Sequence, residues 1–283
     1  MKVAQPAAQV SDKSAGHHTH SNGSLTYSKY LHLDGLLQQQ VPLSDSHDEA
    51  LFIVIHQASE LWLKLCLHEL VAARTCIASE DLRPAFKMLA RVAGIQKQLI
   101  HSWDVLSTMT PSDYLSFRDA LGASSGFQSL QYRLIEFLLG NKNVAHVERF
   151  REDAVAYACL QKSLVAPSLY DETLRLLQRR GLLIPDASVN RDFSEPYVAS
   201  SAVEAAWATV YREPERHWDL YELAEKLVDL EDRFQLWRYA HLRTVTRIIG
   251  HKPGTGGTPG VPYLAKVVEQ TFFPELFSVR TVL

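Results

Sequence analysis

The sequence predicts an all-α fold, a single helical-bundle domain, and two observations support this prediction. Long segments free of glycine and proline carry apolar residues at helical spacing. The period-two alternation of β-branched residues that is typical of strands is nearly absent. With 283 residues, 46% of them hydrophobic, the chain is long enough to bury a substantial core. Its charged fraction of 22% is ordinary for a soluble globular protein.

Charge and cysteine content exclude several classes of function. The formal net charge is −3 at pH 7, so no basic surface for nucleic acid or an anionic membrane is expected. The cysteines, Cys66, Cys76 and Cys159, are scattered through helical apolar patterns, which argues against disulfides and against a zinc site. The N-terminus lacks the apolar segment of a signal peptide, and no apolar run of membrane-spanning length stands out elsewhere. We therefore predict a cytoplasmic protein.

The elements are expected in the following order. Residues 1–24 are rich in Ser, Gly, His and Ala and are predicted to form a flexible tail, followed by a single domain at 25–283. Helical spacing without glycine or proline predicts helices at 49–80, 127–139, 144–163, 168–180, 200–212 and 215–249. A further helix is predicted at 83–107, where Pro84 falls in the first turn. Pro111 opens a short helix, and residues 181–199 are the most loop-like interior stretch.

The helix expected at 49–80 carries a histidine near its start. In LFIVIHQASELWLKLCLHEL, residues 51–70, one narrow polar stripe is formed by Gln57, Glu60, Lys64 and His68. His56 lies beside that stripe on an apolar face. A helix that is apolar almost all round belongs inside a bundle, so we expect His56 to point into the interior. Two interpretations stay open, a hydrogen-bonded core histidine and a functional side chain.

The helix expected at 215–249 has the spacing of a buried bundle seam. The seam residues are Leu220, Leu223, Leu227, Leu230, Phe234 and Trp237. His241 takes the next seam position, where the pattern would place leucine. Burial of an unpaired polar group costs on the order of 1–3 kcal/mol, so His241 needs either a hydrogen bond or a metal-containing ligand. Together with His56 it gives two interior histidines on separate helices, and periodicity alone does not decide their roles.

Two further segments carry groups suited to a ligand. Tyr114, Arg118 and Leu121 lie at i, i+4 and i+7, which places them on one helix face, and a guanidinium suits bidentate capture of a carboxylate. A surface ion pair of Arg118 is the alternative. The stretch GHKPGTGGTPGVPYL, residues 250–264, is a glycine-rich loop that could approach a ligand closely, or a mobile linker. It is not a P-loop, because the G-K-[ST] ending is missing.

Six segments resemble one known family. They are LTYSKYL at 25–31, FIVIHQASELW at 52–62, FRDALGASSGFQSLQYR at 117–133, FQLWRYAH at 234–241, IGHKPGTGG at 249–257 and TFFPELF at 271–277. In order and spacing they resemble tryptophan 2,3-dioxygenases of the bacterial type, over nearly the whole chain from residue 25. The resemblance implies an all-α homotetramer that binds haem b, takes O2 as co-substrate and converts L-tryptophan to N-formylkynurenine.

The resemblance also implies roles for individual residues. His241 is expected to be the proximal ligand of the haem iron, and His56 the distal histidine that accepts a hydrogen bond from the indole N–H. The residues expected to bind substrate are Phe52, Tyr114, Arg118, Leu121, Ser125, Thr255, Tyr27, Tyr30 and Leu31. Among them, Arg118 is expected to hold the carboxylate with Tyr114 beside it, and Thr255 to contact the ammonium and carboxylate groups. Residues 27–31 are expected to reach into the site of a neighbouring subunit.

The chain also departs from the family pattern. Ala240 replaces a basic residue before the proximal histidine, Ala50 stands where methionine is usual, and PLSDSHDEALF is shorter than the usual form. Pro259 and Pro262 stiffen the glycine-rich loop. Two alternatives therefore stay open: a tailoring monooxygenase that converts a β-methyl-tryptophan-type substrate to an oxindole in natural-product biosynthesis, and a non-catalytic helical ligand-binding protein. Product analysis separates the first from a dioxygenase, and an absorption spectrum separates the second.

Overall fold

The computed structural model describes residues 25–257 and 259–283, and within these ranges it contains helices and no strands. The all-α prediction is therefore confirmed for the described part of the chain. The flexible tail predicted at 1–24 lies outside the described residues. The chain divides into two units, one ending at Val41 and one spanning Pro42–Leu283. The single domain predicted from residue 25 stays a prediction.

The helices follow one another with short connections. The first unit contains α1 (Tyr27–Leu31) and α2 (Leu33–Leu36). The second contains α3 (Glu49–Ala78), α4 (Leu82–Leu106), α5 (Pro111–Phe117), η1 (Arg118–Leu121), η2 (Gly126–Gln128), α6 (Leu130–Leu139), α7 (Val144–Glu148), α8 (Ala154–Val165), α9 (Leu169–Arg179), α10 (Asp186–Val189), α11 (Ser201–Arg212), α12 (Trp218–Ile248), α13 (Val261–Val268), α14 (Pro274–Ser278) and η3 (Val279–Thr281).

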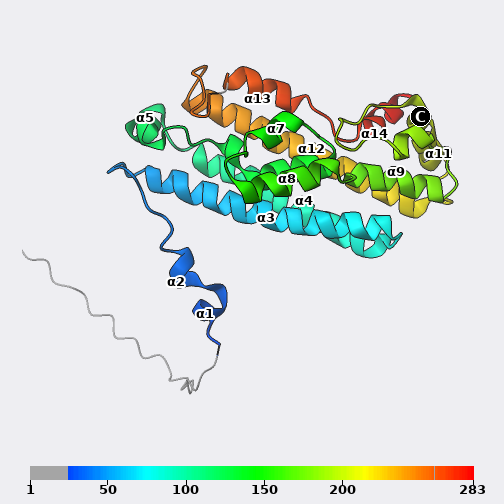
Figure 1. Ribbon diagram of the computed structural model, residues 1–283, viewed down its shortest axis with the longest axis horizontal. Helices are drawn as coiled ribbons and strands as arrows, with labels where there is room; N and C mark the ends of the chain where they lie inside the picture. Colours follow the sequence, from blue (N-terminus) through cyan, green and yellow to red (C-terminus); the bar gives the residue numbers. More distant parts are fainter. Residues whose placement is uncertain (1–24, 258) are drawn as a thin grey trace, which may run out of the picture. The chain divides into compact units, whose positions relative to one another are not determined.

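Three long helices form the framework of the second unit. Helix α4 packs against both α3 and α12, and the three run side by side (Figure 1). Shorter helices cover the framework: α6 and α9 pack on α3, and α13 packs on α12. Because sequential long helices joined by tight connections run antiparallel, the start of α3 lies at the same end of the bundle as the end of α4. This end carries the candidate site.

The predicted seam of α12 is confirmed by burial. Its aliphatic members are essentially inaccessible, with exposed fractions of 0–1% from Leu220 to Leu230, and Phe234 is 5% exposed. The following members, Trp237 and His241, are partly buried. The seam residues from Leu220 to Phe234 therefore fix the helix in the core, whereas Trp237 and His241 are partly accessible.

Side-chain caps explain several helix starts and correct one prediction. The single helix predicted at 144–163 is wrong, because the structure has two helices, α7 and α8, separated by residues 149–153. Asp153 begins α8 by accepting hydrogen bonds from the backbone N–H groups of Val155 and Ala156. This N-cap lies inside a run without glycine or proline, so periodicity did not show the break. Similarly, Thr110 and Asp113 form a capping box at the start of α5.

The face shared by Tyr114, Arg118 and Leu121 also differs from the prediction in detail. Helix α5 ends at Phe117, and Arg118–Leu121 form one turn of 3-10 helix. In this tighter helix, residues three apart lie one above the other, so Arg118 and Leu121 stay on neighbouring positions. The Arg118 side chain reaches the loop after α12 and donates a hydrogen bond to the Pro253 carbonyl of that loop.

A buried ionic cluster joins α6 to α12. The Glu136 carboxylate pairs with Arg133 on the same helix at 2.5 Å and with Arg238 on α12 at 3.1 Å. The three side chains are each 1–3% exposed. Asn141 donates a further hydrogen bond to the same carboxylate, and Arg238 also donates to the Gln270 carbonyl. The cluster lies one helical turn before His241 and therefore fixes the part of α12 that presents this histidine.

Helix α3 is unusually apolar over its length. Its most apolar 18-residue window has a mean hydropathy of 1.4, so by length and composition the helix could cross a membrane, against the prediction that no such run occurs. One such helix is weak support for a membrane span, because long core helices of soluble proteins meet the same criteria. Several of its apolar side chains are exposed in the single chain, among them Val54, Leu61 and Leu65.

Candidate functional site

His56 faces inward from the start of α3, as predicted, and its hydrogen bond defines its protonation. Its Nδ1 atom lies 2.7 Å from the Phe52 carbonyl oxygen. Because a carbonyl only accepts, Nδ1 carries the proton and Nε2 is left with a free lone pair. Burial is the largest influence on this ring and lowers its pKa. A neutral His56 is therefore a hydrogen-bond acceptor at Nε2, with its other nitrogen fixed by the helix backbone.

His241 stands near the end of α12 against an indole ring. The Trp103 side chain of α4 stacks on it, with ring centroids 4.5 Å apart and planes inclined by only 7°. Burial, with the neighbouring charge of His56 as a smaller cause, lowers the pKa of His241 to about 4. The ring is nevertheless partly accessible, and neither nitrogen hydrogen-bonds to any described residue. His241 is therefore a neutral imidazole with an uncommitted lone pair.

The two histidines border the same apolar cluster. Phe52, whose ring contacts that of His56, and Trp103, which stacks on His241, both pack against this cluster. The two histidines come from α3 and α12, which are separated by most of the chain and which α4 bridges. The prediction of two interior histidines on separate helices is thus supported by the geometry, and the two rings belong to one site.

An apolar cluster separate from the main core surrounds this site. The Phe52 ring lies 4.1 Å from the His56 ring, 5.5 Å from Phe117 and 6.2 Å from Tyr114, measured between centroids. Leu121 and Trp103 pack against the same cluster. The structure therefore brings together Phe52, Tyr114 and Leu121, three of the predicted substrate-binding residues, beside the histidines. Aromatic walls of this kind suit a flat aromatic ligand.

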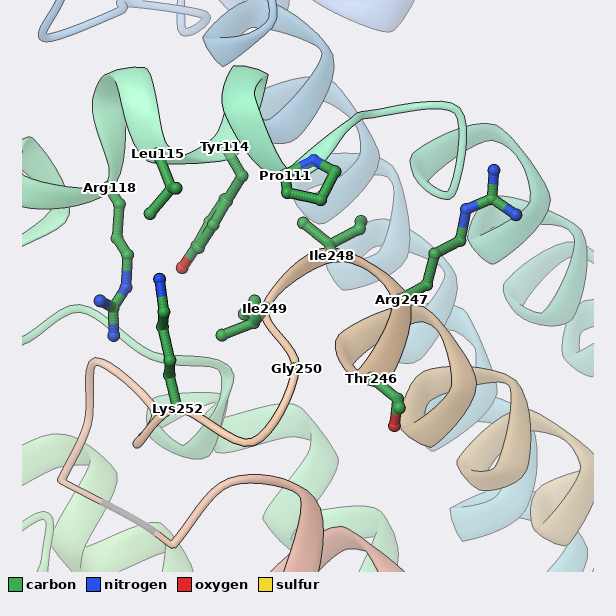
Figure 2. Close-up of a pocket in the computed structure, with 10 residues that line it drawn as sticks. All are labelled: Pro111, Tyr114, Leu115, Arg118, Thr246, Arg247, Ile248, Ile249, Gly250 and Lys252. Atoms are coloured by element: carbon green, nitrogen blue, oxygen red, sulfur yellow. The ribbon is translucent and has the colours of Figure 1, made fainter.

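A basic pocket of about 260 Å³ adjoins the cluster. Figure 2 shows the Tyr114 hydroxyl, the Arg118 guanidinium and the Lys252 amine pointing towards a common space. The pocket is lined by Pro111, Tyr114, Leu115, Arg118, Thr246, Arg247, Ile248, Ile249, Gly250 and Lys252. Three of these side chains are cationic and none is acidic, so the pocket favours an anionic group.

The Arg118 guanidinium has unused hydrogen-bond donors in this pocket. One terminal nitrogen donates to the Pro253 carbonyl at 2.8 Å, while its Nε is buried without a hydrogen-bond partner among the described residues. Burial raises the pKa of Tyr114, and contact with the Arg118 guanidinium opposes that rise, so its hydroxyl remains protonated. A guanidinium and a phenol together can hold a carboxylate by charge-assisted hydrogen bonds.

The glycine-rich loop lies against the segment that follows α5. The Thr255 hydroxyl donates to the Ser124 carbonyl at 2.6 Å, next to Ser125. Ser125 begins η2 and forms a capping box with Gln128. The loop therefore brings Thr255 next to Ser125 and its Pro253 carbonyl to Arg118, and the binding of substrate by these side chains stays a prediction.

The three predicted residues of α1 belong to the other unit. Tyr27, Tyr30 and Leu31 are 76%, 67% and 39% exposed. A helix this short with all of these side chains exposed has no core of its own to hold them. Their assignment to a neighbouring subunit's site stays a prediction.

Sequence reasoning missed two residues of the site. Trp103 falls in a helix whose pattern assigns it to packing, yet its indole nitrogen is buried without a partner among the described residues. The available signal was a tryptophan near the end of a core helix, because a buried indole N–H usually needs a hydrogen-bond partner. Lys252 was passed over within the glycine-rich loop, although a lone cation between glycines is poorly placed for packing.

In the described part of the chain, the helical fold places an interior histidine pair between an aromatic wall and a basic pocket. The model of the tryptophan 2,3-dioxygenase family matches residues 11–209 and 208–283. A protein named tryptophan 2,3-dioxygenase from Erythrobacter litoralis is 62% identical over 259 residues, which cover 92% of this chain and 98% of the relative. Proteins of the same name from a Polaromonas species and from Bacillus cereus are 57% and 55% identical, covering 91% and 95% of this chain and 87% and 96% of the relatives. The chain belongs to the tryptophan 2,3-dioxygenase family.

Proposed function

We propose that the protein is a haem-dependent dioxygenase that inserts both atoms of O2 across the C2–C3 bond of L-tryptophan and yields N-formylkynurenine. The observation that carries the proposal is the pair of neutral histidines on α3 and α12, one a free acceptor and one with an uncommitted lone pair. Family membership and relatives of that name over more than nine-tenths of the chain support it. They favour it over a tailoring monooxygenase and over a binding protein without chemistry.

The described residues fit a haem group. His241 would hold the iron, because it is a neutral, partly accessible imidazole without a hydrogen-bond partner among the described residues. The buried indole N–H of Trp103 is an unused donor beside it. Haem, when bound, supplies the activation of dioxygen, a task for which no amino-acid side chain is suited. The protein's own residues would position the substrate, set the polarity of the site and exclude water from it.

His56 would orient the indole ring. With Nδ1 donating to the Phe52 carbonyl, Nε2 accepts the indole N–H. The neutral state of His56 makes it an acceptor rather than a strong acid, so its role is to hold the ring with C2 and C3 exposed to the oxygen. The Phe52 ring, 4.1 Å from the His56 ring, forms the wall against which the indole would pack.

The amino-acid head would lie in the basic pocket. Arg118 and the Tyr114 hydroxyl would bind the carboxylate, and Lys252 adds a second positive charge on the loop side (Figure 2). The Thr255 hydroxyl, which donates to Ser124 in the protein alone, is placed to contact the ammonium and carboxylate groups when the head group arrives. Fixing both ends of the substrate restricts its rotation and lowers the entropic part of the barrier.

We also propose a cytoplasmic homotetramer in which residues 27–31 of a neighbouring subunit complete the site. Val54, Leu61 and Leu65 of α3 are 47%, 51% and 37% exposed and share one helix face. A row of exposed aliphatic side chains on a long helix suits a contact between subunits. Light scattering of the full chain is the measurement, and a monomer at micromolar concentration would contradict this part of the proposal.

Mass spectrometry of the product tests the reaction. Ferrous, haem-loaded protein is supplied with ¹⁸O2 and, in separate reactions, with L-tryptophan or β-methyl-L-tryptophan. Two labelled oxygens in a ring-opened product from L-tryptophan are expected. One labelled oxygen, found mainly with the methylated substrate, would replace the proposal with the tailoring monooxygenase. Failure to develop a Soret band after reconstitution with haem would favour the binding protein.

A further inference from the structure

The glycine-rich loop is held by three neighbouring contacts to the segment after α5. Arg118 donates to the Pro253 carbonyl at 2.8 Å, and Thr255 donates to the Ser124 carbonyl at 2.6 Å. The third contact is steric: the backbone of Gly256 approaches the Ser125 side chain so closely that a Cβ atom added at Gly256 would lie 2.7 Å from the Ser125 Cβ and 2.8 Å from its Oγ. Real Cβ atoms essentially never approach one another at this distance.

Gly256 is required for space and not for backbone conformation. Its φ angle lies outside the left-handed region, so any L-residue could adopt its backbone. The adjacent Gly257 shows the opposite combination, with a φ of +74° and no atom within 4 Å of an added Cβ. These two adjacent glycines therefore have different roles. Gly257 allows the turn, and Gly256 allows the loop to lie against Ser125.

We propose that the small side chains at 125 and 256 set how closely the loop docks, and that this distance positions the Thr255 hydroxyl at the head group of the substrate. The inference rests on the proposed function for the identity of the substrate. Gly256 and Ser125 are then positioning residues, because they act through Thr255.

The size of the clash supports the assignment. Ordinary contact begins at 3.4 Å, so an alanine at 256 would be about 0.7 Å too close to the Ser125 Cβ. Rotation of the serine side chain moves Oγ but leaves Cβ in place, so only a backbone displacement relieves the overlap. That displacement falls next to the Thr255–Ser124 hydrogen bond, which at 2.6 Å has little tolerance for a shift of this size.

The test uses the full, haem-loaded chain with four variants. Gly256→Ala introduces the clash, Ser125→Gly removes its partner, and the double variant Ser125→Gly/Gly256→Ala restores the space. Gly126→Ala is the matched control, because an added Cβ there meets nothing within 4 Å and its φ is outside the left-handed region. The two alanine substitutions each add one methyl group, and Ser125→Gly removes one hydroxymethyl group.

Hydrogen exchange of residues 250–257 in the absence of substrate is the first measurement. Gly256→Ala should exchange about tenfold faster there than the unsubstituted protein, as the loss of roughly 1.4 kcal/mol of docking free energy requires. The double variant should recover most of the protection, and Gly126→Ala should show none of the loss. Unchanged exchange in Gly256→Ala, or a double variant as unprotected as Gly256→Ala, would overturn the inference.

Steady-state kinetics is the second measurement. Gly256→Ala should raise KM for L-tryptophan about tenfold and change kcat by less than about threefold, because it weakens head-group binding before the chemistry. The double variant should have the KM of Ser125→Gly alone, which separates the clash at residue 256 from any contact that the Ser125 hydroxyl itself makes. A loss confined to kcat would overturn the positioning role. If no variant turns over tryptophan and exchange still follows the pattern above, the proposed function fails while the steric control of docking stands.

Discussion

The buried carboxylate of Glu136 offers the most quantitative prediction. Replacing it with glutamine keeps the shape of the side chain but removes the charge shared by Arg133 and Arg238. Both guanidinium groups would stay buried, at 2–3% exposure. Each also has an Nε without a partner among the described residues, so neither has a spare acceptor at hand.

The expected magnitude follows from this burial. Removing one partner of a buried ion pair destabilises a protein by about 3–5 kcal/mol. Two ion pairs lose their carboxylate here. Arg238 still donates a hydrogen bond to the Gln270 carbonyl and still interacts electrostatically with Glu231, so its share of the lost stability is smaller. We therefore expect Glu136→Gln to reduce the free energy of unfolding by about 4 kcal/mol, or the midpoint of thermal unfolding by about 10 °C.

The chain provides a matched control on its surface. Glu148 and Arg151 form a pair with the same i,i+3 spacing and the same 2.5 Å separation as Arg133 and Glu136. Their side chains are 44% and 73% exposed. Glu148→Gln should therefore cost no more than about 1 kcal/mol. The residue types, the spacing and the distance of the two i,i+3 pairs are the same, so the comparison tests burial together with the second pair that Glu136 makes with Arg238.

Urea unfolding followed by circular dichroism, at equal haem occupancy, measures both variants. A difference of less than about 1 kcal/mol between them would refute the reasoning that burial decides the strength of these pairs. A triple variant with Arg133→Met, Glu136→Leu and Arg238→Met extends the test. It should lose less stability than Glu136→Gln alone, because it leaves no unpaired buried charge.

Four further predictions concern the site and its support. His241→Ala should lose haem or its ferrous Soret spectrum, and a normal ferrous spectrum would exclude His241 as the ligand. His56→Ala should bind haem normally and lower kcat/KM for L-tryptophan about three- to tenfold, the loss of one neutral hydrogen bond; an unchanged kcat/KM would exclude that bond. Lys252→Met should raise KM about two- to fivefold, as the loss of an exposed charge pair would, while His251→Ala should leave KM unchanged; equal effects of the two would remove Lys252 from the site. Burial raises the pKa of Glu231 to about 7, so the folded state holds this proton more tightly than the unfolded state, and the stability of the protein relative to Glu231→Gln should fall as pH rises from about 5 to 7; a flat or rising difference would contradict the burial argument.

The sequence predicted the helical framework well, because helical spacing is a local property. The seam from Leu220 to Ile248 needs only a regular alternation of threes and fours, and the structure buries it in that register. The inward position of His56 followed from the apolar faces of its helix in the same way. A break at a capping residue is less visible, since Asp153 looks like any charged surface residue until its carboxylate is seen to cap α8.

The polar core could not be predicted from local pattern. Glu136 and Arg238 both look like solvent-facing charges, and their partners lie in distant parts of the sequence. The same holds for Glu231, which accepts hydrogen bonds from the backbone N–H groups of Phe272 and Phe273. Such pairs depend on which helices become neighbours, and helical periodicity carries no information about that.

The location of the site at one end of the bundle explains how its tasks are divided. His56 near the start of α3, Trp103 near the end of α4 and His241 near the end of α12 are fixed by long helices that pack against one another. The groups that we propose bind the amino-acid head, including Arg118 and Thr255, come from the short helix and loop that follow α4 and α12. Rings that must hold a cofactor and an indole at fixed angles belong on rigid helices, whereas a head group that must enter and leave requires a segment that can undock. Substitutions in the helices should therefore change haem binding and kcat, and substitutions in the loop should change KM, a separation that steady-state kinetics and haem spectra measure independently.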